Sequence, residues 1–241
     1  KIMSKDAEDE KWTGIDADVK ILTLEHMMAA RRLGFDSFFA PFNKVSKYQM
    51  TFLQGAVPEI DFFTKIILPI AESMKGDGRV ALEILKEYSP LLSKQNTEKP
   101  YELYLKCREK AVDVASMVNE NKTIREIVKI ISDSQLINLP NVVDRASNLV
   151  SDDVKESDDE ELTAWVNTMD LPIEVIRKYD DYVNHRTRFD THQGVKGLEF
   201  DRVLVIIDDS EANCQAAQKL GISTYTPQAG EDWSSIFNLK R

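Results

Sequence analysis

The chain has 241 residues, of which 42% are hydrophobic, so it can form one large domain or two small ones with an ordinary apolar core. Its formal net charge of −10 excludes a nucleic-acid surface that covers the whole molecule. A local contact stays compatible with this charge, because residues 185–188 form a basic cluster. Cys107 and Cys214 are too few for a disulfide framework or a metal site, and we expect a reducing, cytoplasmic location.

No apolar stretch approaches the roughly 18–20 residues that a membrane-spanning helix requires. The best candidate, residues 66–71, is short and contains Pro69. We therefore expect no contact with a membrane. Residues 1–4 lack the apolar core of a secretory signal, and we expect the natural N-terminus to lie upstream of Lys1.

The first predicted element is a strand at residues 19–24, because this short, continuous apolar run is typical of a buried strand. Residues 25–33 then have a helical pattern. Gly34 follows as a natural C-cap, since glycine readily adopts the left-handed conformation that closes many helices.

Residues 45–183 have the pattern of helix after helix, with no convincing strand. Thr123 and Glu126 have the spacing of a capping box. Pro172 suits the first turn of a helix, whereas Pro69 is expected to kink or end one. We expect the apolar stripes at helical spacing to form a core: Phe62, Phe63, Ile66 and Ile67; Ala111, Val114, Ala115 and Val118; Ile124, Ile127, Val128 and Ile131; Leu162, Trp165, Val166 and Met169; Ile173, Ile176, Tyr179 and Val183.

Residues 151–161 carry seven acids and one lysine. We interpret this run as a linker that ends in a helix start, since acids near a helix N-terminus interact favourably with the helix dipole. The helix of Trp165 is therefore expected to begin between Asp158 and Glu161. A metal site is the less favoured alternative, because calcium loops need a glycine and a fixed order of ligands.

Strand character returns at residues 187–190, 202–208 and 222–226. The sequence thus predicts an α/β fold, in which a partial parallel sheet is interrupted by a large all-α insertion. We assign residues 1–44 and 184–241 to the α/β domain and residues 45–183 to the insertion. The strands at 19–24 and 202–207 are expected to lie in one sheet, because short, continuous apolar runs suit a parallel sheet that is covered on both faces.

Residues 191–200 read T-H-Q-G-V-K-G-L-E-F and lead directly into the apolar strand that follows. A turn between glycines lets backbone N–H groups and one carboxylate approach a ligand closely. The run resembles motif V of UvrD/Rep-type superfamily 1 DNA helicases, which has the form T-x-H-x-x-K-G-L-E-F. The resemblance implies the second RecA-like motor domain of such a helicase, in which a helical subdomain is inserted ahead of motif V.

In that family, motif V contacts both single-stranded DNA and nucleotide. By resemblance, Thr191 contacts a DNA phosphate, and Lys196 supports a phosphate or the neighbouring acid. The family's histidine aligns with Gln193, whereas this chain has His192 one position earlier, so the DNA contact is assigned to either residue. The alternative for Thr191 and Lys196 is ordinary capping of a loop.

The resemblance also implies that Gly197 lets the backbone approach ATP and that Glu199 accepts a hydrogen bond from the ribose or positions the phosphate end. The alternative for Glu199 is a solvated acid at a strand edge. The remaining apolar side chains of this stretch are expected in the core: Phe200, Val203, Val205 and Ile206.

Several helicase features are missing from the sequence, a late arginine-finger motif among them. No run has the G-x-x-x-x-G-K-[ST] order of a phosphate-binding loop, and no acidic magnesium motif follows an apolar strand. The first strand is followed by Leu24-Glu25-His26 where the family often has Arg-Thr-Asn. His26 is either a substitute contact or, by preference, a plain helix-start histidine. We therefore expect ATP and Mg²⁺ to act only in the full-length protein, and this part to need no cofactor and to lack ATPase activity alone.

The tail departs from the helicase pattern. Residues 208–225 read as an acidic pair, a helix, a glycine cap and a strand, which resembles the C-terminal segment of haloacid dehalogenase-like phosphatases. That family's nucleophile motif, D-x-D-x-[TV], is missing, so Asp208 and Asp209 are interpreted as strand-end residues without a metal. The alternatives to a helicase part are thus a helical module that docks a protein partner and a fragment of such a hydrolase.

Overall fold

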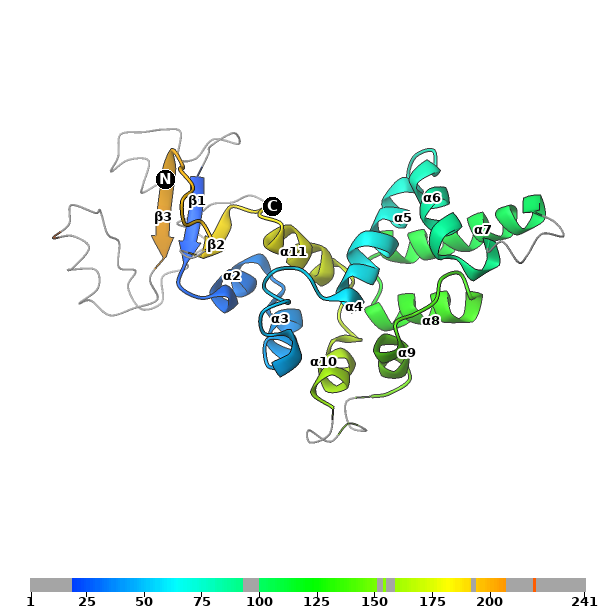
Figure 1. Cartoon of the computed structure of the whole chain (residues 1–241), viewed down its shortest axis with the longest axis horizontal. Helices are drawn as coiled ribbons and strands as arrows, with labels where there is room; N and C mark the ends of the chain where they lie inside the picture. Colours follow the sequence, from blue (N-terminus) through cyan, green and yellow to red (C-terminus); the bar gives the residue numbers. More distant parts are fainter. Residues whose placement is uncertain are drawn as a thin grey trace. The chain divides into compact units, whose positions relative to one another are not determined.

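The computed structural model describes residues 19–92, 100–150, 154, 159–191, 194–206 and 219 (Figure 1). The chain divides into two compact units. One contains Lys1–Ala29 and Thr187–Arg241, and the other contains Ala30–Arg186. The helical unit thus begins at Ala30, ahead of the expected start at residue 45.

Within the described residues, the first unit contains a three-stranded parallel sheet (Figure 1). Its strands are β1 (Val19–Thr23), β2 (Phe189–Thr191) and β3 (Arg202–Ile206), in the order β2-β1-β3. Strand β1 pairs in parallel with both others, so the prediction that the first and last described strands share a parallel sheet is confirmed. The α/β class is confirmed, and the helices lie between β1 and β2 in the sequence.

Strand β3 corrects one expectation. Val203 and Val205 were expected in the core but are 40% and 50% exposed, whereas Ile206 is buried as expected. Within the described residues β3 is an edge strand, and its valines share a face with Lys20 and Leu22 of β1, their register partners. An apolar run identifies a strand but not how completely each face of it is covered.

An aromatic cluster forms the centre of the helical unit. Helix α2 (His26–Leu33) ends at Gly34, whose φ of +76° confirms the predicted glycine cap. Helix α3 (Asp36–Phe42) then presents three buried phenylalanines, Phe38, Phe39 and Phe42. Tyr179 stacks on Phe52 with ring centroids 4.7 Å apart, and Phe42 meets Trp165 edge-on at 4.9 Å. These contacts explain why α3 belongs to the helical unit.

A continuous helical run follows as α4 (Pro58–Asp61), a π-helical segment (Phe62–Ile67) and α5 (Leu68–Ser73). Pro69 was expected to kink or end a helix, yet the helix continues through it. Proline lacks the N–H that the interior of a helix needs, and here it lies in the first turn after the wider π-helical winding. The helix therefore changes from π-helical to α-helical winding next to Pro69 instead of ending there.

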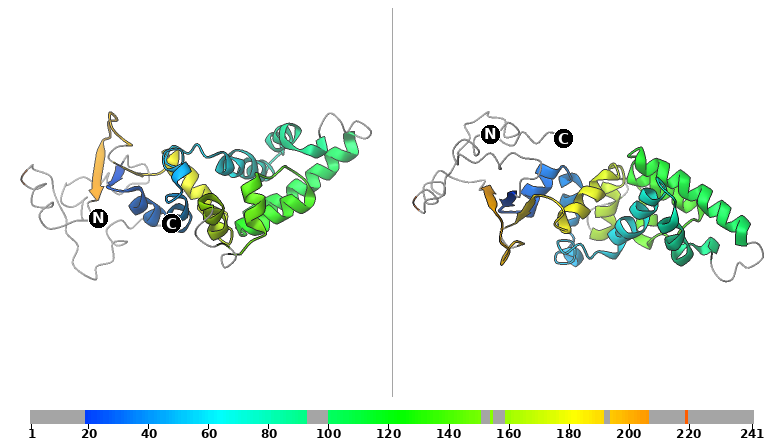
Figure 2. Two further views of the ribbon diagram at one scale, coloured as in Figure 1. Left: turned by 60° about the horizontal axis from the view of Figure 1, so that its bottom comes forward. Right: turned by 90° about the horizontal axis from the view of Figure 1, so that it is seen from above.

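Four further helices extend the unit: α6 (Arg79–Tyr88), α7 (Pro100–Asn119), α8 (Ile124–Ser134) and α9 (Asn141–Ser147). Figure 2 shows α7, the long green helix, lying against α8, and α7 also packs on α5. The predicted stripes of α7 and α8 are buried. The predicted capping box is confirmed, because the Thr123 side chain accepts from the Glu126 N–H and the Glu126 carboxylate accepts from the Thr123 N–H.

The unit closes with α10 (Glu160–Thr168) and α11 (Glu174–Val183). Asp159 caps α10 by accepting from the Leu162 N–H at 3.0 Å, so the acidic run does supply a helix start. Trp165 and Ile176 are fully buried, as expected. Most of residues 151–158 lie outside the described residues.

Arg125 links three helices of this unit. Its Nη1 donates to the carbonyl oxygens of Ser147 and Leu149, both at 2.7 Å, at the C-terminal end of α9. Its Nε donates to Asp170, just after α10, at 2.6 Å. The last carbonyls of a helix lack partners within the helix, so a guanidinium that reaches them stabilises the helix end.

Trp165→Ala is predicted to lower the free energy of unfolding by roughly 3–5 kcal/mol, because it leaves a cavity between Phe42 and Phe63. Trp165→Phe should cost clearly less, since it keeps both ring contacts and removes an indole N–H that has no hydrogen-bond partner in the described structure. Urea unfolding followed by circular dichroism measures both. A loss under about 1 kcal/mol for the alanine variant would contradict this packing.

Arg125→Ala is predicted to cost more than about 2 kcal/mol, because it leaves partly buried carbonyl groups at the end of α9 without their guanidinium donor. Lys129→Ala is the matched control, since Lys129 is exposed on the same helix, and it should change stability by no more than about 0.5 kcal/mol. Equal effects of the two variants in the same unfolding assay would show that Arg125 does not link these helices.

Candidate functional site

Thr191 is the last residue of β2 and lies at the carboxyl edge of the sheet. Loops at this edge of a parallel sheet are where ligands usually bind. Thr191 is 3% exposed, and its hydroxyl accepts from the Gly194 N–H at 3.2 Å. The hydroxyl therefore caps the turn that follows, as in the capping alternative. His192 and Gln193 lie outside the described residues.

Residues 194–201 return the chain to the amino end of β3. Because β1 lies between β2 and β3, this connection crosses the face of β1. The Phe200 ring lies 5.7 Å from the Lys20 ammonium on that face. Val195 is buried, and its N–H donates to the Thr191 carbonyl at 3.3 Å. The described part of the connection is thus fixed to the sheet near both ends.

The middle of the connection faces solvent. Lys196, Gly197 and Glu199 are all exposed, and the Leu198 N–H closes a turn on the Val195 carbonyl at 3.0 Å. Gly197 has a φ of +85°, and nothing lies within 4 Å of the place where a Cβ would stand. Glycine is therefore required by backbone conformation rather than by crowding. An ammonium, a carboxylate and open backbone are available here to a ligand.

Two charged residues that sequence reasoning missed lie beneath the connection. Lys20 on β1 and Asp190 on β2 are 8% and 4% exposed, and they form an ion pair at 3.2 Å. Lys20 interrupts the apolar strand β1, Asp190 is the middle residue of the short strand β2, and charged side chains are almost never buried without a partner. That interruption was the available signal, but it did not show which two charges meet across the sheet.

His26 begins α2, directly after the carboxyl end of β1. Burial lowers its pKa below 6.5, and the nearby Asp190 carboxylate partly offsets the shift. The imidazole is therefore mainly neutral at pH 7, which favours a hydrogen-bonding role over a cationic phosphate contact.

No group of three His, Cys, Asp or Glu side chains is placed to hold a metal ion within the described residues. Asp208 and Asp209, the acidic pair of the tail, lie outside them. None of the described helices is long and apolar enough to cross a membrane.

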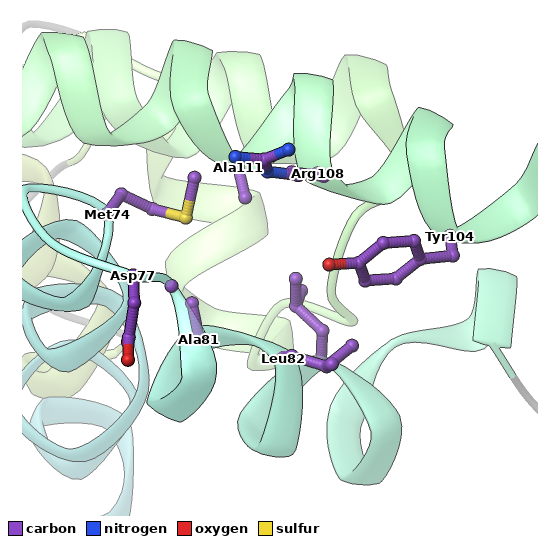
Figure 3. A pocket seen from close by; sticks show the side chains of 9 residues that line it. Met74, Asp77, Ala81, Leu82, Tyr104, Arg108 and Ala111 are labelled. Carbon is purple, nitrogen blue, oxygen red and sulfur yellow. The ribbon is translucent and has the colours of Figure 1, made fainter.

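A small pocket lies between α6 and α7, and none of the predicted site residues lines it (Figure 3). Figure 3 shows the Tyr104 ring extending from α7 toward Leu82 of α6. The pocket has room only for a water-sized molecule, so it does not suit a nucleotide.

Comparison with known proteins gives no assignment: no family model matches the chain, and no curated protein or solved structure is significantly similar to it.

His26 is predicted to titrate with a pKa below 6.5 in the folded chain. Because the unfolded state then binds the proton more readily, the histidine lowers stability as the pH falls through 6.5 and below. His26→Gln should therefore lose less free energy of unfolding than the parent chain between about pH 7.5 and about pH 5. NMR titration, with the signal assigned by its absence in the variant, gives the pKa directly. A value at or above 6.5 would contradict the burial argument.

Proposed function

We propose that this chain is part of the second, RecA-like motor domain of an ATP-dependent UvrD-like DNA helicase. The observation that supports this most is the exposed Lys196-Gly197-Leu198-Glu199 turn, which joins two parallel strands of one sheet. The central strand of that sheet precedes a large helical segment, and the other two strands follow it. This is the layout that the motif V resemblance implies.

Lys196 is the better candidate for the DNA contact. Its side chain is exposed, whereas the Thr191 hydroxyl is buried and engaged with Gly194. Thr191 then acts by shaping the loop, and His192 or Gln193 supplies a further contact. A single cationic position suits a chain whose net charge is −10, because phosphate binding must be local.

The nucleotide contact is proposed for Gly197 and Glu199. The open backbone at Gly197 lets a ligand approach, and the exposed Glu199 carboxylate can accept hydrogen bonds from ribose hydroxyls. Translocation requires two RecA-like domains that close on ATP, so this chain supplies one surface of the site. No described carboxylate cluster fits Mg²⁺, and the magnesium ligands are assigned to the first motor domain.

A second candidate function has one specific observation in its favour. Helix α7 exposes Tyr101 by 71%, Leu105 by 43% and Val112 by 45%, residues that lie on one face at helical spacing. Exposed apolar side chains gathered in this way suit a protein partner. Such docking is compatible with the helicase proposal, because it uses the helical unit and leaves the motif V turn free.

The proposal predicts different losses for two neighbouring residues in a protein that joins this chain to a first motor domain. Glu199→Ala should reduce DNA-stimulated ATP turnover by about tenfold or more with little effect on single-stranded DNA affinity, since it removes a nucleotide contact. Lys196→Ala should mainly weaken DNA binding. ATPase assays and fluorescence anisotropy with single-stranded DNA measure the two properties.

The controls are Asp201→Asn, an exposed acid two positions beyond Glu199, and Lys65→Ala, an exposed lysine on the π-helical segment. Both should leave turnover and affinity within about twofold of the parent protein. If Glu199→Ala and Lys196→Ala behaved like these controls, the motif V roles would not apply to this chain.

A further inference from the structure

The buried pair formed by Lys20 and Asp190 has contacts at both ends of the connection from β2 to β3. At the first end, the Asp190 carboxylate accepts from the Thr191 N–H at 2.8 Å, and Thr191 in turn holds the Gly194 N–H. At the other end, the Lys20 ammonium faces the Phe200 ring at 5.7 Å. The two partners lie on adjacent strands, yet one charge meets the start of the connection and the other meets its end.

Gly194 shows how closely the connection follows the carboxylate. A Cβ at this position would lie 2.3 Å from the Asp190 Oδ1, although Gly194 itself is exposed to solvent. No real Cβ approaches an oxygen so closely, so any other residue would displace the turn or the carboxylate. Lys20 holds that carboxylate in place at 3.2 Å and also donates to the Thr187 carbonyl at 3.3 Å.

Burying this ion pair lowers stability unless its two side chains make further favourable contacts. Removing two charges from water is strongly unfavourable, and similar-sized apolar residues often replace such a pair without loss of stability. The contacts at both ends of the connection give the charges a use that apolar side chains cannot supply.

We propose that Lys20 and Asp190 are positioning residues that set the conformation of residues 194–200, and thereby the placement of Lys196 and Glu199 for phosphate-bearing ligands. The placement of Lys196 and Glu199 for ligands rests on the proposed function, whereas the effect on the conformation of residues 194–200 does not depend on it. Lys20 lies 167 positions before Thr187 in the sequence, yet its ammonium also donates a hydrogen bond to the Thr187 carbonyl. Neither residue touches the ligand; each acts through the turn.

The test is amide hydrogen exchange by NMR on the whole chain, in Asp190→Asn and Lys20→Met. Each variant keeps the size of the side chain and removes one charge. We expect the N–H groups of Gly194, Val195 and Leu198 to exchange at least about tenfold faster, while those of Ile21 and Leu204 within the sheet change by less than about threefold. Lys20→Arg should restore slow exchange, because it keeps the cation. The control is Lys75→Met, which breaks an exposed ion pair with Glu72.

Gly194→Ala supplies a second measurement. It should accelerate exchange at Val195 and Leu198 when Asp190 is present, and it should have a smaller effect in an Asp190→Ala background, where the collision is gone. Unchanged exchange in residues 194–198 of both charge variants would overturn the positioning role, as would equal acceleration across the whole sheet. Faster exchange in the connection with unaltered single-stranded DNA binding would support the positioning role and contradict the proposed function instead.

Discussion

The pairing of β1 with two strands from the far end of the sequence is the constraint on which the α/β unit depends. Strand β1 has a partner on each side, and every one of its residues is buried. Both partners follow the helical segment in the sequence, so the sheet forms only when that segment brings its own ends together. Bringing the two ends of this long segment together reduces chain entropy before any contact between the strands has formed. The compact aromatic and helical core of residues 30–186 offsets this loss, because its packing brings the ends of the segment together.

The same pairing determines the path of the connection from β2 to β3. With β1 in the middle, the chain from β2 to β3 must cross one face of it, and that face carries a buried ion pair rather than apolar side chains alone. The connection is held near Thr191 and Phe200 while Lys196 and Glu199 face solvent between them. The two ends of the connection are fixed while its charged middle is exposed. Such an arrangement suits ligand binding, because little conformational entropy remains to be lost when a ligand binds.

Local pattern predicted most of the elements, because periodicity and capping act over a few residues. The capping box at Thr123 and the stripe through Ile131 are read directly from the sequence, and so is the glycine cap at Gly34. Burial across the sheet was harder, since an apolar run does not reveal that Val203 and Val205 lie on an edge strand. The pairing of Lys20 with Asp190 was out of reach, because it depends on strand register between distant segments. The sequence pattern also did not predict that the helix continues through Pro69, because this depends on the π-helical winding that precedes it.

The contact proposed between Lys196 and a phosphate of single-stranded DNA is the part of the helicase proposal that this chain can test by itself. The most direct test is fluorescence anisotropy of a labelled single strand with this chain, as salt rises from about 25 mM to about 200 mM. We expect affinity to fall as salt rises, and the Lys196→Ala variant to bind more weakly with a salt slope lower by about 0.7, the value for one lost contact to a single strand. Affinity and salt slope that are the same in the variant and the parent chain would contradict the claim.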